Sequence, residues 1–83
     1  MAIRTGVKKK RNQVMIDLVG ANIRKHREAL GYSQDRFAVL CDLEKKLISN
    51  YELGKVEMSL TNICIISHHL NLLPNELLIV KEV

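Results

Sequence analysis

Hydrophobic residues recur at spacings of three and four along most of the chain, which is the period of one helix face rather than of a strand. The first such stretch predicts a helix over residues 16–29, and Gly31 follows where a left-handed terminus needs no side chain. The expected inward face of this helix consists of Ile16, Val19, Ile23, Arg27 and Leu30.

Two shorter helices are predicted next. Ser33 can cap a helix over residues 34–41, because its hydroxyl can accept a free backbone N–H. A break at residues 41–43 contains Asp42, one of the few non-glycine residues that tolerate positive φ, and a third helix over residues 44–52 ends at Gly54. The inward residues are Phe37, Ala38 and Cys41 in the second helix and Ile48 and Tyr51 in the third.

The last part of the chain predicts two more helices. Ser59 caps one over residues 60–70, ending at Asn71, and Pro74 opens the other, since proline is tolerated in a first turn. Their apolar residues are Leu60, Ile63, Ile66 and Leu70, then Leu77, Leu78 and Val80. Because 83 residues have room for one modest core, we expect an all-α fold of five helices in one domain.

Residues 1–14 have no hydrophobic period and predict a flexible basic arm ahead of a folded domain at residues 15–83. The arm carries five bases and no acid: Arg4, Lys8, Lys9, Lys10 and Arg11. It could add affinity for nucleic acid by releasing counterions or by following a groove, or it could only solubilise the chain.

The remaining 69 residues hold eight bases and nine acids, so overall basicity does not show that the domain binds nucleic acid. The charge is nevertheless polarised. Residues 24–55 hold seven bases and five acids, whereas residues 56–83 hold one base and three acids. That distribution is expected if one end of the domain faces phosphate.

Residues 33–52 have the geometry of a helix-turn-helix, in which the second helix can enter the major groove of DNA. The residues closely resemble the Cro and phage-repressor (XRE) family, whose fold is the lambda-repressor-like domain. The resemblance is carried by Ser33-Gln34, Phe37-Ala38, Ile48 and Glu52-Leu53-Gly54-Lys55, and it extends over roughly residues 16–80. It implies a DNA-binding transcriptional regulator, most simply a repressor.

The third predicted helix places four polar residues on the face opposite Ile48, namely Lys45, Lys46, Ser49 and Asn50. Lysine can donate to guanine O6 and N7, and asparagine can pair with adenine, so these are the expected base contacts. Alternatively, the two lysines lie on a helix face that contacts only solvent. The resemblance adds Gln34 as a contact to a base or phosphate, and Arg24, Ser33 and Lys55 are candidates for phosphate contacts.

The resemblance also implies that Arg27 and Glu52 form a structural ion pair between the first and third helices. The chain departs from the family pattern at Asp42, which replaces the turn glycine, and at Glu44, which replaces a small polar cap. Glu44 could repel phosphate or accept from cytosine N4, and Leu47 could pack against a thymine methyl or against the neighbouring loop.

Other chemistry has little support. Cys41 and Cys64 are expected as buried thiols, and Cys64 with His68 and His69 falls short of the four ligands of a structural zinc site, so no metal or cofactor is expected. No nucleophile motif, paired carboxylates or glycine-rich phosphate loop predicts an enzyme. No apolar run is long enough to span a bilayer, which favours a cytoplasmic protein.

The helix over residues 60–70 is apolar almost all round, which suggests a homodimer seam with Ile65, Leu73, Leu77, Ile79 and Val83. The alternative is that these residues fill the core of a monomer. Such a dimer predicts a palindromic operator on double-stranded DNA. Two alternatives to a free-standing repressor are an antitoxin, which would also bind a toxin, and a restriction-modification controller protein.

Overall fold

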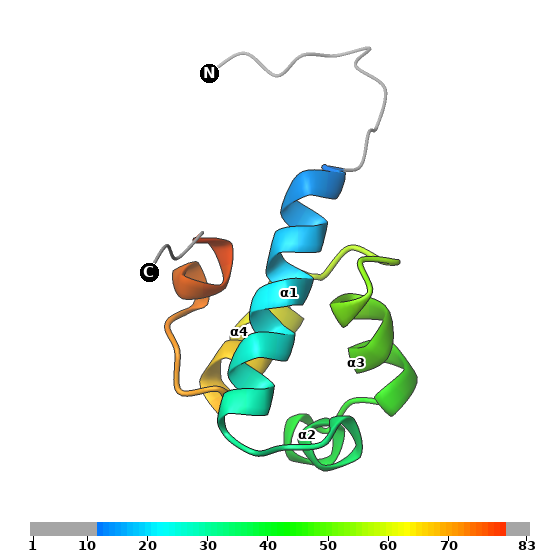
Figure 1. Cartoon of the computed structure of the whole chain (residues 1–83), viewed down its shortest axis with the longest axis vertical. Coiled ribbons are helices and arrows are strands. Elements are labelled where there is room, and N and C mark those ends of the chain that lie inside the picture. The colour runs from blue at the N-terminus through cyan, green and yellow to red at the C-terminus, as the bar shows by residue number, and fades with distance from the viewer. Residues whose placement is uncertain (1–11, 80–83) are drawn as a thin grey trace.

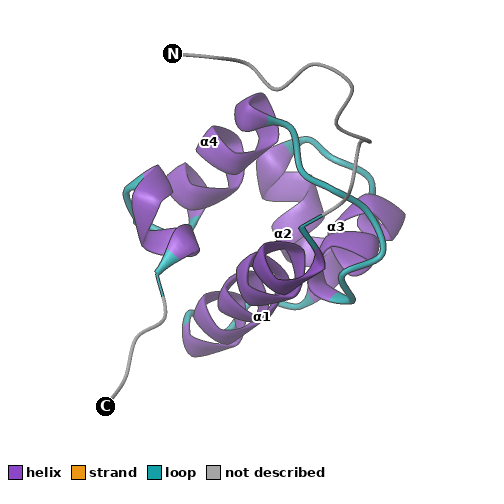
Figure 2. Ribbon diagram, turned by 90° about the horizontal axis from the view of Figure 1, so that it is seen from above, coloured by secondary structure: helices purple, strands orange, loops and turns teal. Residues whose placement is uncertain are grey.

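The structure is a computed structural model that describes residues 12–79, and all of its regular elements are helical. The longest element is α1, and α3 and the short 3-10 helix η1 lie on either side of it (Figure 1). Seen from above, the helices enclose a common centre (Figure 2). The bounds are Gln13–Ala29 for α1, Gln34–Cys41 for α2, Lys45–Glu52 for α3, Leu60–His69 for α4 and Pro74–Leu78 for η1.

The main differences from the expected bounds lie at the two ends. Helix α1 begins three residues early, because the Asn12 side chain accepts the backbone N–H of Met15 at 3.1 Å and caps the helix. Residues 12–14, which were expected to belong to the basic arm, are therefore part of the domain, and the rest of the expected arm, residues 1–11, lies outside the described part. The fifth predicted helix is a single 3-10 element, and Val80 lies beyond the described residues.

All four α-helices are followed by a residue in the left-handed conformation. These residues are Gly31, Asp42, Gly54 and Asn71, with φ between 56° and 80°. After α3, for example, Gly54 N donates to the Tyr51 carbonyl and Lys55 N donates to that of Asn50. Such paired bonds satisfy the last carbonyls of a helix. After α2 the corresponding bonds are donated by Asp42 N and Leu43 N, which confirms that Asp42 can replace the turn glycine.

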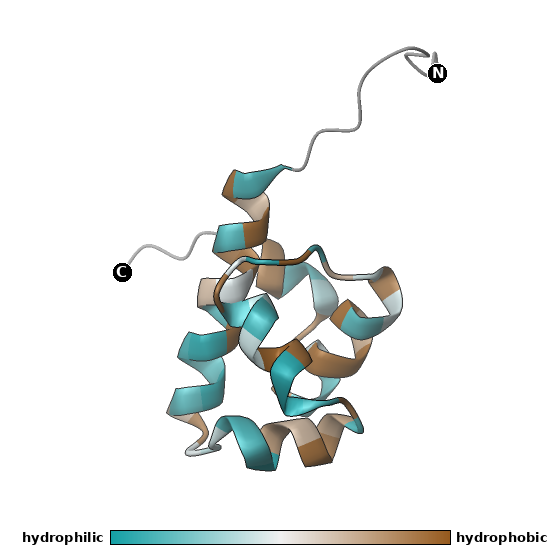
Figure 3. Cartoon of the chain, turned by 90° about the vertical axis from the view of Figure 1, so that its right-hand side faces the viewer, coloured by the Kyte–Doolittle hydropathy of each residue, from teal (hydrophilic) through white to brown (hydrophobic). Residues whose placement is uncertain are grey.

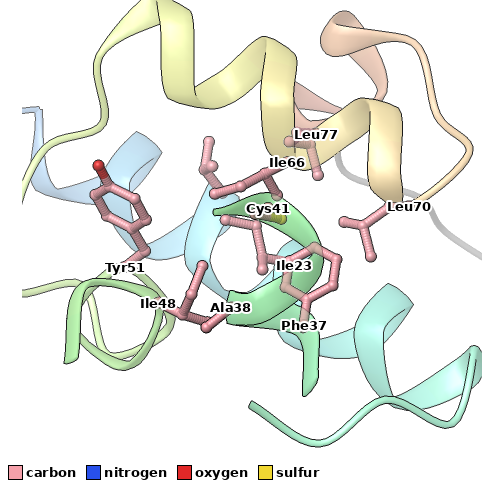
Figure 4. Packing of buried hydrophobic residues seen from close by; sticks show 10 residues of the cluster. Ile23, Phe37, Ala38, Cys41, Ile48, Tyr51, Ile66, Leu70 and Leu77 are labelled. Carbon is pink, nitrogen blue, oxygen red and sulfur yellow. The ribbon is translucent and has the colours of Figure 1, made fainter. Parts of the chain in front are cut away.

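The core draws one or more side chains from every element (Figure 4). Ile23, Phe37, Ile48, Ile66 and Leu77 are fully buried. Burial of a side chain of this size contributes roughly 1.5–3 kcal/mol, so the short helices depend on this shared core rather than on their own helical propensity.

Three expectations about burial were wrong. Leu60, assigned to the inward face of α4, is 80% exposed, because it is the first residue of the helix and lies beyond the core. Cys64 is exposed, whereas Cys41 is buried and its burial raises the pKa of the thiol to about 11. Leu30, assigned to the inward face of the first helix, is 41% exposed, because it lies just after the last residue of α1. Leu77 is fully buried within the protomer and Ile65 packs partly against the same core, so these two residues fit the alternative of a filled monomer core rather than a dimer seam.

Helices α1 and α3 approach each other closely at Gly20. A Cβ atom at this position would overlap the carbonyl oxygen of Tyr51 and lie 3.0 Å from that of Glu52. Because both neighbours are backbone atoms, neither can rotate away. The absence of a side chain at Gly20 therefore sets the distance between α1 and the last turn of α3.

A buried ion pair connects the same two helices. Arg27 Nε donates to Glu52 Oε2 at 2.7 Å and Arg27 Nη2 donates to Oε1 at 3.0 Å, while Nη1 donates to the carbonyl of Tyr32 at 2.7 Å. The hydrogen bond to Glu52 raises the pKa of Arg27 and outweighs the desolvation that opposes it. The ion pair implied by the family resemblance is therefore confirmed.

Replacing Gly20 by alanine should destabilise the fold by about 1–3 kcal/mol, because overlap with backbone outweighs the ~0.5–1 kcal/mol that alanine gains in a helix. Urea unfolding followed by circular dichroism would measure the change. The exposed neighbour supplies a control, since Ala21→Gly should lose only the helical propensity. A Gly20→Ala variant more stable than the wild type would contradict the close approach.

The substitution Glu52→Gln should lower the free energy of unfolding by about 3–5 kcal/mol, because it leaves the buried Arg27 charge without its partner. Glu28→Gln is the matched control. The Glu28 side chain is 55% exposed and lies 4.0 Å from the same guanidinium, so its loss should cost at most about 1 kcal/mol. Equal effects of the two substitutions would show that burial does not set the strength of the interaction.

Candidate nucleic-acid interface

Helices α2 and α3 are joined by the short turn at residues 42–44, as a helix-turn-helix requires. Ser33 begins the unit, since its hydroxyl accepts the backbone N–H of Arg36 at 3.0 Å and caps α2. Glu44 occupies the corresponding position before α3 but makes no side-chain capping bond. The carboxylate of Glu44 is therefore not used to cap α3.

Helix α3 is divided into a buried face and a polar face. Ile48 and Tyr51 are buried in the core, and Asn62 donates to the Tyr51 hydroxyl at 2.8 Å. The four predicted base contacts on α3 are exposed or half-buried: Lys45, Lys46, Ser49 and Asn50. Figure 3 views the molecule from the α3 side and shows hydrophilic segments along its ribbon.

The two lysines of this face differ in their surroundings. Lys45 Nζ lies 3.5 Å from Asp35 Oδ2, in an exposed ion pair between the first turns of α3 and α2. Within the described residues, Lys46 has no acidic partner within 4.0 Å. Lys46 is therefore the freer of the two cations, a difference that the spacing of the residues along the chain does not reveal.

The surroundings of Gln34 differ from those of the other four residues that were predicted to contact bases. Its side chain is half-buried, and its Nε2 donates to Glu52 Oε1 at 2.9 Å. The amide thus joins the buried ion pair of Arg27 and Glu52. Nothing in the sequence predicts this contact, because residues 18 positions apart on separate helices carry no local signal of pairing.

The three candidate phosphate contacts are not equally available. Arg24 Nε lies 3.2 Å from Glu28 Oε2 on the exposed side of α1, and the Ser33 hydroxyl already serves as a cap. Lys55 is exposed three residues after the end of α3. Gln13, the first residue of α1, lies next to Lys55 on the surface, because Gln13 Nε2 donates to the carbonyl of the preceding residue, Gly54, at 2.9 Å.

Leu47 is half-buried and packs against the core, which favours the structural alternative for this residue over contact with a thymine methyl. The surface also has an apolar groove of about 170 Å³, lined by residues that include Met15, Val56, Met58 and Leu78. None of the predicted DNA contacts lines this groove. The polar face of α3 and the groove are therefore separate features.

Across residues 12–79, no group of three or more His, Cys, Asp or Glu side chains is arranged to hold a metal ion. His68 and His69 contact each other edge to face, with ring centroids 5.1 Å apart. The same part of the chain contains no helix long and apolar enough to cross a membrane.

Solved structures similar to the chain include three proteins whose sequences differ from it to different degrees. The restriction-modification controller protein C.AhdI from Aeromonas hydrophila has 32% identity and a TM-score of 0.72, over 75% of this chain and 94% of that one. A hypothetical transcription factor from Neisseria, NHTF, has 23% identity and a TM-score of 0.76, over 88% and 85%. The clp gene regulator ClgR from Corynebacterium glutamicum has 22% identity and a TM-score of 0.74, over 77% and 68%.

The last two structures share the fold with this chain at low identity, while C.AhdI is similar in sequence as well. No curated protein sequence gives a significant match. The helix-turn-helix family model matches residues 23–77, which include α2, α3, α4 and both residues of the Arg27–Glu52 pair. The chain is therefore a member of the XRE-type helix-turn-helix family.

Proposed function

We propose that this chain is a cytoplasmic regulator that binds double-stranded DNA in a sequence-specific manner and acts as a repressor, with α3 in the major groove. The observation that carries the proposal is the division of α3 into two faces. Its apolar face and Glu52 are held in the core, while its polar face is left in solvent. We assign no catalytic role to any residue of the chain.

Lys45, Lys46, Ser49 and Asn50 are the proposed base contacts. Lys46 has no competing partner among the described residues and could donate to guanine, and Asn50 could pair with adenine. Lys45 would have to exchange its exposed ion pair with Asp35 for a contact to DNA. Such a pair is worth about 0–1 kcal/mol, so the exchange is a small barrier.

The proposed phosphate contacts are Lys55, Ser33 and Arg24, and Lys55 has the most support because it is exposed in the loop that follows α3. The contact of Gln13 with Gly54 supports a role for the basic arm as well. It brings the start of α1, and so the point where residues 1–11 join the domain, beside Lys55. We therefore include Arg4, Lys8, Lys9, Lys10 and Arg11 among the proposed phosphate ligands.

A homodimer is the proposed binding form, through a surface that keeps only Leu73 and Ile79 of the expected seam. Leu60, Leu73, Leu78 and Ile79 are apolar and exposed, whereas Leu77 and Ile65 contribute to the protomer's own core. Val83 lies outside the described residues. A dimer would place two copies of α3 about one turn of DNA apart, roughly 34 Å, and would require a palindromic operator.

A restriction-modification controller is the second candidate, because C.AhdI is 32% identical over 94% of its own length. The genes beside this one would discriminate between the candidates. An adjacent restriction enzyme or methyltransferase gene favours the controller, and an adjacent toxin gene favours the antitoxin alternative.

Selection from a random pool of DNA duplexes should yield a defined motif with two inverted half-sites. Lys46→Ala and Asn50→Ala should each relax the preference at one position per half-site and lose roughly 1–3 kcal/mol of discrimination there. Lys25→Ala removes an exposed lysine of α1 and should leave the motif unchanged. Failure of the wild-type protein to enrich any motif would contradict sequence-specific binding, and unchanged motifs for both α3 variants would contradict the proposed reading face.

Removal of residues 1–11 should weaken DNA binding and flatten its salt dependence, because each phosphate that the arm neutralises contributes about 0.9 to the slope of log K against log salt. With five bases in the arm, the slope should fall in magnitude by about 1–4. A full-length chain with these five bases replaced by glutamine controls for length. An unchanged slope in both variants would favour the solubilising alternative.

A further inference from the structure

Gln34 and Glu52 are the two outer ends of the helix-turn-helix. Gln34 is the first residue of α2, and Glu52 is the last residue of α3. The turn at residues 42–44 connects the other two ends covalently. The hydrogen bond from Gln34 Nε2 to Glu52 Oε1 therefore closes the side of the unit that the chain itself leaves open.

The Glu52 carboxylate needs donors from more than one helix. Its side chain is only 3% exposed, so a lone pair that lost its donor would not be rehydrated at low cost. Arg27 supplies two N–H groups from α1, and Gln34 supplies one from α2. The three side chains thus join α1, α2 and α3 at a single carboxylate.

The same geometry limits what else Gln34 can do. Its amide would have to leave Glu52 to turn fully towards a base, and Glu52 would then keep donors from α1 alone. Lys46 and Asn50, by contrast, have no side-chain hydrogen bond or ion pair to break within the described residues. Contact of Gln34 with a base therefore carries a cost that contact of Lys46 or Asn50 does not.

We propose that Gln34 is a positioning residue, which fixes the angle between α2 and α3 through Glu52 and affects DNA recognition through Lys46 and Asn50. This role replaces the base or phosphate contact that the family resemblance implied, and it rests on the proposed function. Without the bond, a smaller fraction of the protein would hold α3 at the angle that fits the groove, and the apparent affinity would fall in proportion to that fraction.

The free protein provides the first test. Gln34→Met keeps the length of the side chain and removes the donor, so backbone amides of the last turn of α3 should exchange with deuterium roughly three- to ten-fold faster. Val39→Ala, an exposed substitution in the same helix, should change these rates less than two-fold. Unchanged exchange in Gln34→Met would overturn the positioning role, whatever the variant does on DNA.

DNA binding provides the second test, with the motif selected by the wild-type protein and an unrelated duplex as the two probes. Gln34→Met should lose roughly three- to ten-fold in affinity for the motif and less than two-fold for the unrelated duplex. Equal losses on both duplexes would indicate a phosphate contact instead, because phosphate contacts are independent of sequence.

Combination with Lys46→Ala separates positioning from direct base reading. If Gln34 acts through α3, the double variant should lose clearly less affinity than the product of the two single losses. A loss equal to that product, with preference relaxed at a single base pair, would overturn the proposal in favour of a direct contact. If the wild-type protein selects no motif, the proposed function fails, and the exchange measurement still decides whether Gln34 holds α3.

Discussion

The interaction between Arg27 and Glu52 is the constraint on which the rest of the domain depends. Helix α3 has only eight residues, which is too short to be stable alone, and its polar face must remain in solvent if it is to read DNA. Ile48 and Tyr51 hold it by one apolar face. The ion pair adds a directional link at the last residue of α3, and Gly20 lets α1 come close enough to form it.

A buried ion pair is a costly way to hold a helix, because desolvation of two charges can exceed their attraction. Here the guanidinium donates two hydrogen bonds to Glu52 and one to the carbonyl of Tyr32. The pKa of Arg27 is raised rather than lowered, because the hydrogen bond to Glu52 outweighs desolvation. The arrangement therefore favours one orientation of α3, which apolar packing alone would leave free to slide. Orientation matters more than added stability for a helix that must fit a groove.

Local features of the fold could be predicted from the sequence, and features that depend on distant neighbours could not. Ser33, Asp42 and Ser59 act within a few residues of the chain, so their roles at helix ends follow from residue type. Helical periodicity predicted the correct face for Ile66 but not for Leu60, because periodicity does not say where a neighbouring helix stops covering that face. The contact of Gln34 with Glu52 depends on the packing of two helices and leaves no trace in spacing.

Charge is distributed so that affinity and specificity can arise in different parts of the chain. Residues 12–79 carry seven bases and eight acids, and one of the two lysines at the start of α3 is paired with Asp35. A domain that is close to neutral gains little from long-range attraction to phosphate, so its binding must depend on short-range contacts that require a fixed α3. In the proposed complex the five bases of residues 1–11 would supply the sequence-independent part of the affinity. Because the domain itself attracts phosphate only weakly, it would dissociate readily from wrong sequences, where the base contacts of α3 are missing.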